Sequence, residues 1–273
     1  VLALTSPSFD IAVLELFLPL LTGARVVVAS PADAVDPQRL AALVRSEGVT
    51  VAQATPVTWQ HLLAAAGGPS AGDGAAGAGD GGGGLRLRLA LCGGEQVPRA
   101  LAGQLCAVAG EAWNMYGPTE TTVWSLVWRL TPGQQGPVPI GRPIANTTAW
   151  VMDPQLRPAP LGVPGELCIG GAGLANGYHG LPALTRARFV TAASGERLYR
   201  TGDLARLTDD GVFHFLGRGD NQVKLRGHRI ELDEISAVLR RHPAVADAVA
   251  VLRADDAGAP HLVAYVVPQA AAG

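Results

Sequence analysis

Helical and strand patterns alternate along the first half of the chain, and this alternation restricts the possible folds more than any other feature of the sequence. Apolar residues at helical spacing are followed by short runs rich in β-branched residues, with Gly23 and Gly48 between the two kinds of segment. The expected helices cover 11–21, 37–47, 59–66 and 98–109, and the expected strands cover 24–28, 49–52 and 85–92. Strands separated by helices usually pair in parallel, so residues 1–136 are predicted to form an α/β core around a largely parallel sheet.

The helical pattern over 11–21 is apolar on nearly every side. Glu15 interrupts it and Arg25 follows it, so the run is too short and too polar to cross a bilayer. A helix of this kind is typical of a protein interior, and we expect it to be buried.

From Pro137 onward the pattern changes to short strands separated by glycine and proline. Strands are expected at 149–152 and 166–169, and the turn Asp209-Asp210-Gly211 lies between two partly alternating runs, which predicts a hairpin. Residues 137–219 are therefore predicted to form a β-rich subdomain, which completes a large unit over residues 1–219.

The remaining residues, 220–273, predict a small α+β unit. It combines a hairpin around Gly227-His228, a helix over 235–239 and strands near 245–252 and 262–267. We place the boundary between the two units near Gly219-Asp220, where a glycine and a charged residue separate two strand patterns.

Residues 67–84 contain little besides glycine, alanine, serine and aspartate. No strand leads into this segment and no lysine follows it closely, unlike in a phosphate-binding glycine motif. The composition instead predicts a flexible surface loop.

Charge and cysteine content narrow the choice of partner and compartment. The formal net charge is −2 and only 16% of residues are charged, so there is no basic surface for nucleic acid or for an anionic membrane. A small-molecule ligand is expected instead. The three cysteines, Cys92, Cys106 and Cys168, lack the spacing of a disulfide framework or a zinc site, which favours the reducing cytoplasm.

The segment 114–122 carries polar groups suited to a nucleotide. Gly117-Pro118 predicts a sharp turn, with Asn114 and Tyr116 before it and Thr119 and Glu120 after it. An aromatic ring can stack on a purine, an amide can contact base edges, a hydroxyl can contact phosphate, and a carboxylate can bind Mg²⁺. A strand, a turn and a capped helix beginning at Thr119 would account for the same residues without a ligand.

Three further polar clusters accompany this segment: Phe9-Asp10, residues 199–204 and residues 217–234. In the second cluster, the carboxylate of Asp203 can accept hydrogen bonds from ribose hydroxyls, and in the third, Arg218 can reach ribose or phosphate oxygens. A surface turn with an ion pair is the alternative. Cations and anions balance within 217–234, which argues against a nucleic-acid face.

Four motifs together resemble the adenylation domains of nonribosomal peptide synthetases, which belong to the adenylate-forming superfamily. They are Asn-x-Tyr-Gly-Pro-Thr-Glu at 114–120, Gly-Glu-Leu-x-Ile-Gly-Gly at 165–171, Tyr-Arg-Thr-Gly-Asp-Leu at 199–204, and Gly-Arg-x-Asp-x-Gln-Val-Lys-Leu-Arg-Gly-x-Arg-Ile-Glu-Leu at 217–232. The resemblance spans nearly the whole chain. It implies that ATP and an amino acid react to give an aminoacyl adenylate and pyrophosphate, with Mg²⁺, followed by transfer to a carrier protein's phosphopantetheine thiol.

The resemblance also implies a role for each matching residue. Asn114 and Tyr116 would contact adenine, Thr119 the α-phosphate, Glu120 the magnesium ion, and Asp203 and Arg218 the ribose. In the small unit, Asp220 would be the hinge, and Lys224 and Gly227 would face the site during thiolation. The implied partners are the peptidyl carrier and condensation domains of the same assembly line.

Phe9-Asp10 resembles the family segment whose aspartate pairs with the substrate ammonium group, which favours an amino acid over a fatty acid. The positions that the resemblance assigns to the substrate pocket are Asp10, Ile11, Leu14, Gln53, Ala90, Cys92, Met115, Val123 and Trp124. Bulky side chains at Leu14, Met115 and Trp124 would leave little room, so glycine or another small amino acid is the expected substrate.

The sequence also departs from the family pattern. The phosphate loop and the C-terminal catalytic lysine of the family have no counterpart in this chain, which is expected to be a piece cut at both ends and impaired in adenylation. Asn176 stands where arginine is usual. Two alternatives therefore stay open: an acyl-CoA-type ligase of the same superfamily, and a non-catalytic nucleotide-binding module.

Overall fold

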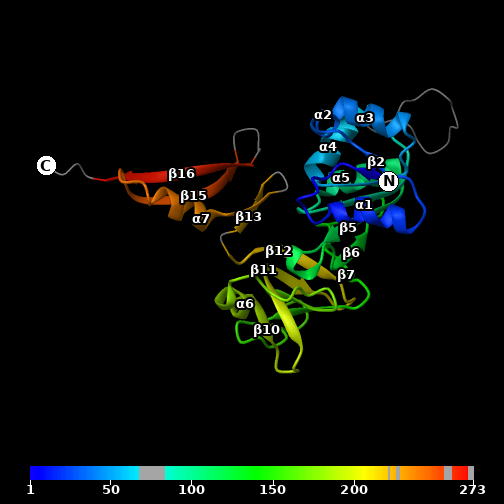
Figure 1. Ribbon diagram of the computed structural model, residues 1–273. Coiled ribbons are helices and arrows are strands. Elements are labelled where there is room, and N and C mark those ends of the chain that lie inside the picture. Colours follow the sequence, from blue (N-terminus) through cyan, green and yellow to red (C-terminus); the bar gives the residue numbers. More distant parts are fainter. Residues whose placement is uncertain (68–83, 221, 226–227, 255–259, 270–273) are drawn as a thin grey trace. The chain divides into compact units, whose positions relative to one another are not determined.

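The computed structural model describes residues 1–67, 84–220, 222–225, 228–254 and 260–269. The chain divides into two compact units, Val1–Leu216 and Gly217–Gly273 (Figure 1). The glycine-rich segment predicted to be a flexible loop falls almost entirely on 68–83, and Gly227 falls on 226–227, so both predictions lie outside the described residues.

A five-stranded sheet forms the centre of the α/β part of the first unit. Its order is β3-β4-β5-β6-β7. The strands are β3 (Val51–Ala54), β4 (Leu87–Gly93), β5 (Ala109–Tyr116), β6 (Leu126–Arg129) and β7 (Arg142–Pro143). The parallel prediction is confirmed for β3, β4 and β5, but β6 and β7 pair antiparallel, because the chain reverses directly after β5 without a crossover helix. A separate parallel pair joins β1 (Leu2–Ala3) to β2 (Val27–Val28).

Helices connect these strands, and local sequence signals set where several of them begin. The helices are α1 (Ala12–Leu21), α2 (Pro31–Val35), α3 (Pro37–Ser46), α4 (Pro56–Ala65) and α5 (Arg99–Val108). Ser30, Asp36 and Thr55 each accept a hydrogen bond from a backbone N–H of the first turn that follows, and a proline occupies the first helical position after each of them. The α/β alternation that the sequence predicts is therefore present.

The main core fills the space between one face of this sheet and the helices. Trp59 of α4 is fully buried, and its indole N–H donates to the Leu91 carbonyl 2.9 Å away. Leu40, Leu62, Leu101 and Leu105 come from α3, α4 and α5, and all are nearly inaccessible to solvent. Burying each of these side chains contributes on the order of 1.5–3 kcal/mol.

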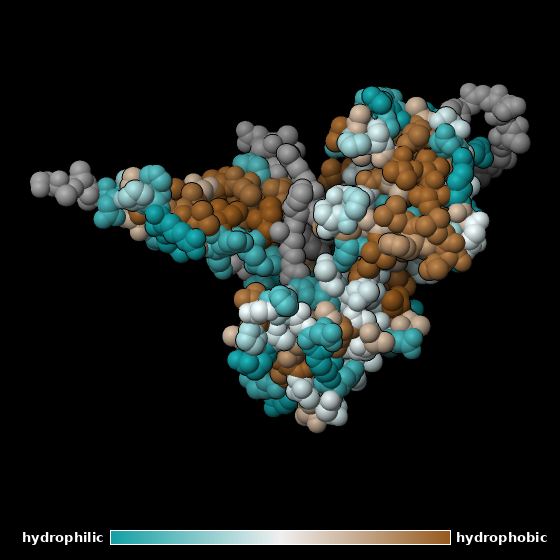
Figure 2. Space-filling model, in the orientation of Figure 1, coloured by the Kyte–Doolittle hydropathy of each residue, from teal (hydrophilic) through white to brown (hydrophobic). Residues whose placement is uncertain are grey.

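Helix α1 does not fit the prediction that it is buried. Only Ala12, Glu15 and Pro19 form a buried stripe, whereas Phe17 is 58% and Leu21 85% exposed. Figure 2 shows the resulting apolar patch over α1. Hydropathy alone suggested burial, but the described residues of this unit cover just one side of the helix, so the other apolar side chains face outward.

The β-rich part of the first unit is a second five-stranded sheet. Its order is β10-β11-β9-β8, and β12 also pairs with β11. The elements are β8 (Thr147–Met152), β9 (Gly165–Gly171), α6 (Pro182–Arg188), β10 (Phe189–Thr191), β11 (Arg197–Leu207) and β12 (Phe213–Arg218). In β9, Leu167 and Ile169 enter one apolar cluster and Cys168 enters another, as alternation in a strand requires. Residues 208–212 connect β11 to β12, as predicted for this hairpin.

The second unit contains two antiparallel strand pairs and one helix. They are β13 (Gln222–Leu225), β14 (His228–Glu231), α7 (Leu232–Leu239), β15 (Val245–Ala254) and β16 (Pro260–Pro268). This agrees with the predicted α+β composition. The division after Leu216 falls slightly before the predicted boundary near Gly219-Asp220.

Candidate nucleotide and substrate site

A tight turn after β5 presents the polar residues of the segment 114–122. A Cβ atom on Gly117 would lie 2.4 Å from the Val123 carbonyl oxygen and 2.7 Å from the Trp124 Cα, so only glycine allows this close approach. The alternative of a helix capped at Thr119 reduces to one 3₁₀ turn, η1 (Thr119–Thr121).

The backbone directly after η1 adopts a costly conformation. Thr122 and Val123 have φ angles of 64° and 66°, which β-branched residues rarely adopt. Such positions persist only where surrounding contacts hold them, and they are common at functional sites. One such contact is the bond from the Thr122 hydroxyl to the Gly173 carbonyl at 2.7 Å.

Tyr116 and Asp203, which belong to different motifs, are in direct contact. The Tyr116 hydroxyl donates to the Asp203 carboxylate, and the two residues are separated by 87 positions in the sequence. Both are almost fully buried, at 9% and 4% exposed, and the Tyr116 ring belongs to the apolar cluster of the second sheet. Little of the side chain is therefore open to the adenine base that the sequence assigned to it.

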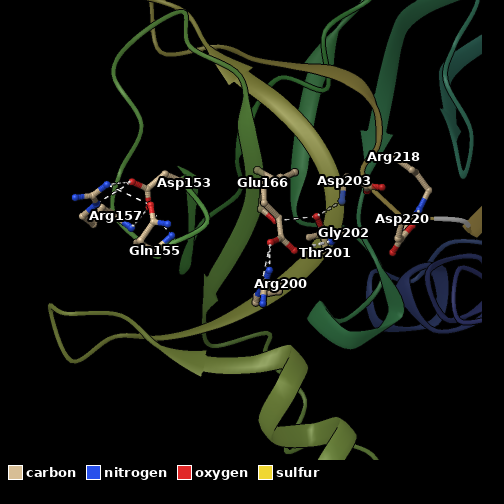
Figure 3. Close-up of polar contacts among 11 residues, drawn as sticks. Asp153, Gln155, Arg157, Glu166, Arg200, Thr201, Gly202, Asp203, Arg218 and Asp220 are labelled. Atoms are coloured by element: carbon tan, nitrogen blue, oxygen red, sulfur yellow. Dashed lines mark hydrogen bonds and ion pairs between the residues drawn. The ribbon is translucent and has the colours of Figure 1, made fainter.

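A bulge in β11 places Asp203. The pairing of β11 with β9 shifts register between Arg200 and Leu204, and the carboxylate of Glu166 lies beside this irregularity. Glu166 accepts two bonds from the Arg200 guanidinium, at 2.9 and 2.6 Å, and one from the Gly202 N–H at 3.1 Å (Figure 3). Charge-assisted bonds of this kind hold the bulge in one conformation.

Two further polar contacts surround these residues. Asn114 is 4% exposed and its side-chain amide donates to the Pro139 carbonyl at 2.7 Å. Thr201 donates to the Leu167 carbonyl at 2.7 Å and accepts from the Asp203 N–H at 3.0 Å. Asn114, Tyr116 and Asp203, which the sequence assigned to adenine and ribose, are thus held by hydrogen bonds within the first unit.

Glu120 projects from η1 toward two tyrosines of the β-rich part. The Tyr178 hydroxyl donates to Glu120 Oε1 at 2.7 Å, and it lies 3.4 Å from the Tyr199 hydroxyl. Burial raises the pKa of Tyr178, and the hydrogen bonds with Tyr199 and Glu120 raise it further, so this residue stays a donor at neutral pH. Tyr178 was not among the predicted site residues, because its contact with Glu120 joins positions 58 residues apart in the sequence.

Strand register defines which residues share one face of the first sheet. Gln53 pairs with Leu91, and Gly93 pairs with Met115. Paired residues of parallel strands point to the same side, and so do alternate residues within a strand. We call this side, formed by Gln53, Leu91, Gly93 and Met115, the Gln53 face.

Trp124 lies against the Gln53 face. Its indole N–H donates to Gln53 Oε1 at 3.0 Å, and a Cβ on Gly93 would lie 2.6 Å from the tip of its ring. The Gln53 Nε2 group donates to the Ile11 carbonyl at 2.9 Å. The structure therefore brings together Ile11, Gln53, Met115 and Trp124 of the predicted pocket.

Ala90 and Cys92 point to the opposite side of β4, which disagrees with their predicted place in the pocket. Both are fully buried in the main core with Ala52, Ala54 and Ala112. Burial raises the pKa of the Cys92 thiol, and that of Cys168 to about 12, so neither is a nucleophile. The prediction was displaced by one residue, and a one-residue shift in a strand moves a side chain to the other face. Leu91 and Gly93 lie on the Gln53 face instead.

The remaining predicted pocket residues lie in or beside the segments already described. Asp10 precedes α1, Leu14 lies within α1, and Val123 is the strained residue before Trp124. Asp10 and Leu14 are partly exposed. Among the residues that the structure describes, none donates a hydrogen bond to the Asp10 carboxylate.

In the second unit, two predicted functional residues contact each other. Arg218 donates from Nε to Asp220 Oδ1 at 2.7 Å and from Nη2 to Oδ2 at 2.8 Å, a bidentate ion pair. The sequence assigned Arg218 to ribose and Asp220 to a hinge. The Lys224 backbone lies in β13, paired with Arg229.

The donor set at Thr119, Glu120 and Asp203 fits a magnesium nucleotide. Thr119 is exposed, so its hydroxyl can reach a phosphate oxygen, and Asp203 offers the carboxylate chemistry that binds ribose hydroxyls. The described residues contain no group of three or more histidine, cysteine or carboxylate side chains that could enclose a metal. A single carboxylate with phosphate oxygens is a usual environment for Mg²⁺.

Comparisons with known proteins show the family to which the chain belongs. The pattern of the AMP-binding enzyme family matches residues 1–179. A dimodular nonribosomal peptide synthase of Bacillus subtilis (strain 168) is 44% identical over 273 residues, covering 99% of this chain. The chain belongs to the AMP-binding enzyme family and, within it, to the adenylation domains of nonribosomal peptide synthetases.

Solved structures share the same fold. A four-domain nonribosomal peptide synthetase bound to AMP and glycine matches 98% of this chain at 43% identity, with a TM-score of 0.70. A second synthetase protein, which contains adenylation and PCP domains and is bound to a vinylsulfonamide inhibitor, matches 100% at 31% identity, with a TM-score of 0.81.

The chain is short beside these proteins. It covers 11% of the Bacillus subtilis relative, 19% of the four-domain structure and 46% of the second structure. Within the described residues, no helix has the length and apolar character needed to cross a membrane.

Proposed function

We propose that this chain takes part in activating a small amino acid for nonribosomal peptide synthesis. In the first step, the amino acid carboxylate attacks the α-phosphorus of ATP, the bond to the β-phosphate oxygen breaks, and aminoacyl adenylate and pyrophosphate form. In the second step, a phosphopantetheine thiol attacks the acyl carbon, AMP leaves, and a thioester forms. The contact between Tyr116 and Asp203 carries this proposal, because it joins two motifs of the nucleotide site in one rigid position.

Positioning and charge neutralisation are the main contributions of the residues in the first unit. Asp203 would accept hydrogen bonds from the ribose hydroxyls, while Asn114 and Tyr116 would contact adenine. Thr119 would donate to the α-phosphate. Mg²⁺ would neutralise the phosphate oxygens, and Glu120 would hold it there.

Asp10 and the Gln53 face support an amino acid of small size as the substrate. A partly exposed carboxylate with no donor among the described residues suits an ammonium group. The Trp124 ring lies against the Gln53 face, so close to Gly93 that even a Cβ atom there would collide with the ring tip and with the Met115 carbonyl oxygen. Glycine is the substrate that we propose.

The second unit would serve the thioester step. Asp220 would be the hinge about which this unit rotates, and Lys224 and Gly227 would then approach the thiol. The expected partners are a peptidyl carrier domain and a condensation domain. The unpaired cysteines suit a cytoplasmic protein.

Amino-acid-dependent exchange of pyrophosphate into ATP, measured on the full-length protein with a panel of amino acids, tests this function. Glycine should support the fastest exchange. Asp10→Ala should reduce kcat/KM for glycine by about a hundredfold, because the substrate ammonium group would lose its charge partner. Asp209→Ala, in the exposed turn between β11 and β12, is the matched control and should leave exchange unchanged.

Two results would contradict the proposal. Exchange driven by aliphatic acids that lack an ammonium group, with Asp10→Ala as active as the wild type, would favour an acyl-CoA-type ligase. Tight binding of ATP without any exchange would favour a non-catalytic nucleotide-binding module.

A further inference from the structure

Glu15 is a buried carboxylate on a helix that is otherwise largely exposed. Its side chain is 0% exposed, although Val13, Phe17 and Leu18 on the same helix are about half exposed or more. Burying a charge is costly unless several donors surround it. A residue with no more than a packing role at this position would be apolar.

Four hydrogen bonds satisfy the Glu15 carboxylate. Oε2 accepts from the backbone N–H groups of Leu4 and Thr5, at 2.9 and 3.0 Å. Oε1 accepts from the Thr5 hydroxyl at 2.6 Å and from Gln53 Nε2 at 3.0 Å. Three of these bonds anchor the carboxylate to the segment before α1, and the fourth connects it to the Gln53 face.

The bond from Gln53 fixes which end of its amide faces which neighbour. Glu15 Oε1 and the Ile11 carbonyl can only accept, so both require the amide nitrogen. The amide oxygen must then face Trp124, whose indole N–H can only donate. If the amide were reversed, its oxygen would face two acceptors, Glu15 Oε1 and the Ile11 carbonyl. Its nitrogen would face the indole N–H of Trp124, which is a donor.

Trp124 in turn limits the space beside the Gln53 face. Its ring tip approaches Gly93, where even a methyl group would collide with it. Its backbone follows the strained residues Thr122 and Val123, so side-chain contacts are needed to hold it. The bond to Gln53 is the polar contact that does so.

We propose that Glu15 is a positioning residue that sets the size limit for the substrate by orienting Gln53 and, through it, the Trp124 ring. The proposal rests on the function proposed above. Glu15 itself does not contact the substrate in this scheme. Discrimination between glycine and alanine, which differ by one methyl group, depends on the position of the ring.

Glu15→Gln is the decisive variant. The backbone N–H groups of Leu4 and Thr5 would still bind the oxygen of the new amide. The nitrogen of the new amide would then face Gln53 Nε2, and two donors would oppose each other. Gln53 would then reverse and turn its nitrogen toward the Trp124 N–H. We expect the ratio of kcat/KM for glycine to that for alanine to fall about tenfold in pyrophosphate exchange, with the KM for ATP unchanged.

Thr5→Val is the matched control, because it removes one bond to Glu15 but leaves the bond from Gln53. It should lower the melting temperature as Glu15→Gln does, without altering the glycine-to-alanine ratio. A folded Glu15→Gln protein with an unchanged ratio, or equal changes of the ratio in both variants, would overturn the proposal.

A measurement without turnover separates this proposal from the proposed function. In full-length protein labelled with 5-fluorotryptophan, the ¹⁹F signal of Trp124, assigned with Trp124→Phe, should shift in Glu15→Gln and stay in place in Thr5→Val. An unmoved signal in Glu15→Gln would reject the link from Glu15 to Trp124. If none of the amino acids supports pyrophosphate exchange by the wild-type protein, the proposed function fails. The ¹⁹F signal still decides whether Glu15 orients Trp124.

Discussion

The hydroxyl of Tyr116 donates to the carboxylate of Asp203 and so connects the turn after β5 to the bulge in β11. The two residues belong to different sheets of the first unit. Their contact fixes the relative position of two segments that we assign to the same nucleotide.

Tyr116→Phe should destabilise the protein by about 2 kcal/mol, because a nearly buried carboxylate loses a donor. The KM for ATP should rise in the same variant. Urea unfolding measures the first effect and pyrophosphate exchange the second. Tyr265→Phe, at a side chain that is 52% exposed, is the control and should change neither. Equal stability of the two variants would refute the structural importance of the contact.

Glu166→Gln should loosen the bulge that presents Asp203. A neutral amide would replace the carboxylate that accepts hydrogen bonds from Arg200 and from the Gly202 N–H, so these bonds would be weaker. We expect the KM for ATP to rise about tenfold with little change in the KM for the amino acid. Asp153→Asn breaks the exposed ion pair with Arg157 that is also drawn in Figure 3, and it should leave both KM values unchanged. A rise in the KM for the amino acid alone would argue against this role of Glu166.

Gly117→Ala should destabilise the protein by about 3 kcal/mol or more, because the new Cβ would collide with backbone atoms of Val123, Trp124 and Ser125. Gly103→Ala offers the opposite result. Gly103 lies inside α5 with no atom near its Cβ position, so alanine should stabilise the helix by about 0.5–1 kcal/mol. Thermal unfolding of the two variants distinguishes them by sign.

His214 should make the protein less stable in mild acid. Partial burial lowers the pKa of His214 below its ordinary value of 6.5, and the charge of Arg206 lowers it further, against a smaller opposing effect of Asp210. The unfolded chain therefore binds a proton at a higher pH than the folded protein does. The stability associated with neutral His214 is present above pH 6.5 and is lost as the pH falls from there toward the folded pKa.

The corresponding measurement is the melting temperature at about pH 7.5 and about pH 5.5, on either side of the ordinary histidine pKa. His214→Gln cannot gain the proton and should lose less stability than the wild type over this interval. An identical loss in both proteins would mean that other groups cause the acid sensitivity.

Much of the fold was predictable because its signals are local. The helix predicted over 37–47 begins after Asp36, whose side chain accepts bonds from backbone groups two and three residues away. Helix α2 was not predicted, and α4 begins at Pro56, before the predicted start at residue 59. The order of strands and helices follows from residue periodicity alone. The antiparallel edge of the first sheet was not predictable in this way, because it depends on how β6 turns back onto β5.

Ala90 and Cys92 show where local reasoning stops. Each lies in a predicted strand, and each was placed in the pocket, but the register of β4 against β3 and β5 points them into the core. Leu91 and Gly93 take the opposite side. Leucine alternates with other residues over 85–92, but Ala90, Leu91, Cys92 and Gly93 are all buried, so the alternation does not indicate which of the two buried sides faces the predicted pocket.

The amino-acid sequence by itself determined the class of fold, the family and the chemical groups available for a nucleotide, because these are written in short-range patterns and in motif identity. Tertiary structure alone decided that Tyr116 meets Asp203, that Glu15 connects to Trp124 through Gln53, and that one side of α1 is exposed. Each of these depends on contacts between residues distant in sequence, and such contacts form only when strand register and packing are fixed across the whole unit.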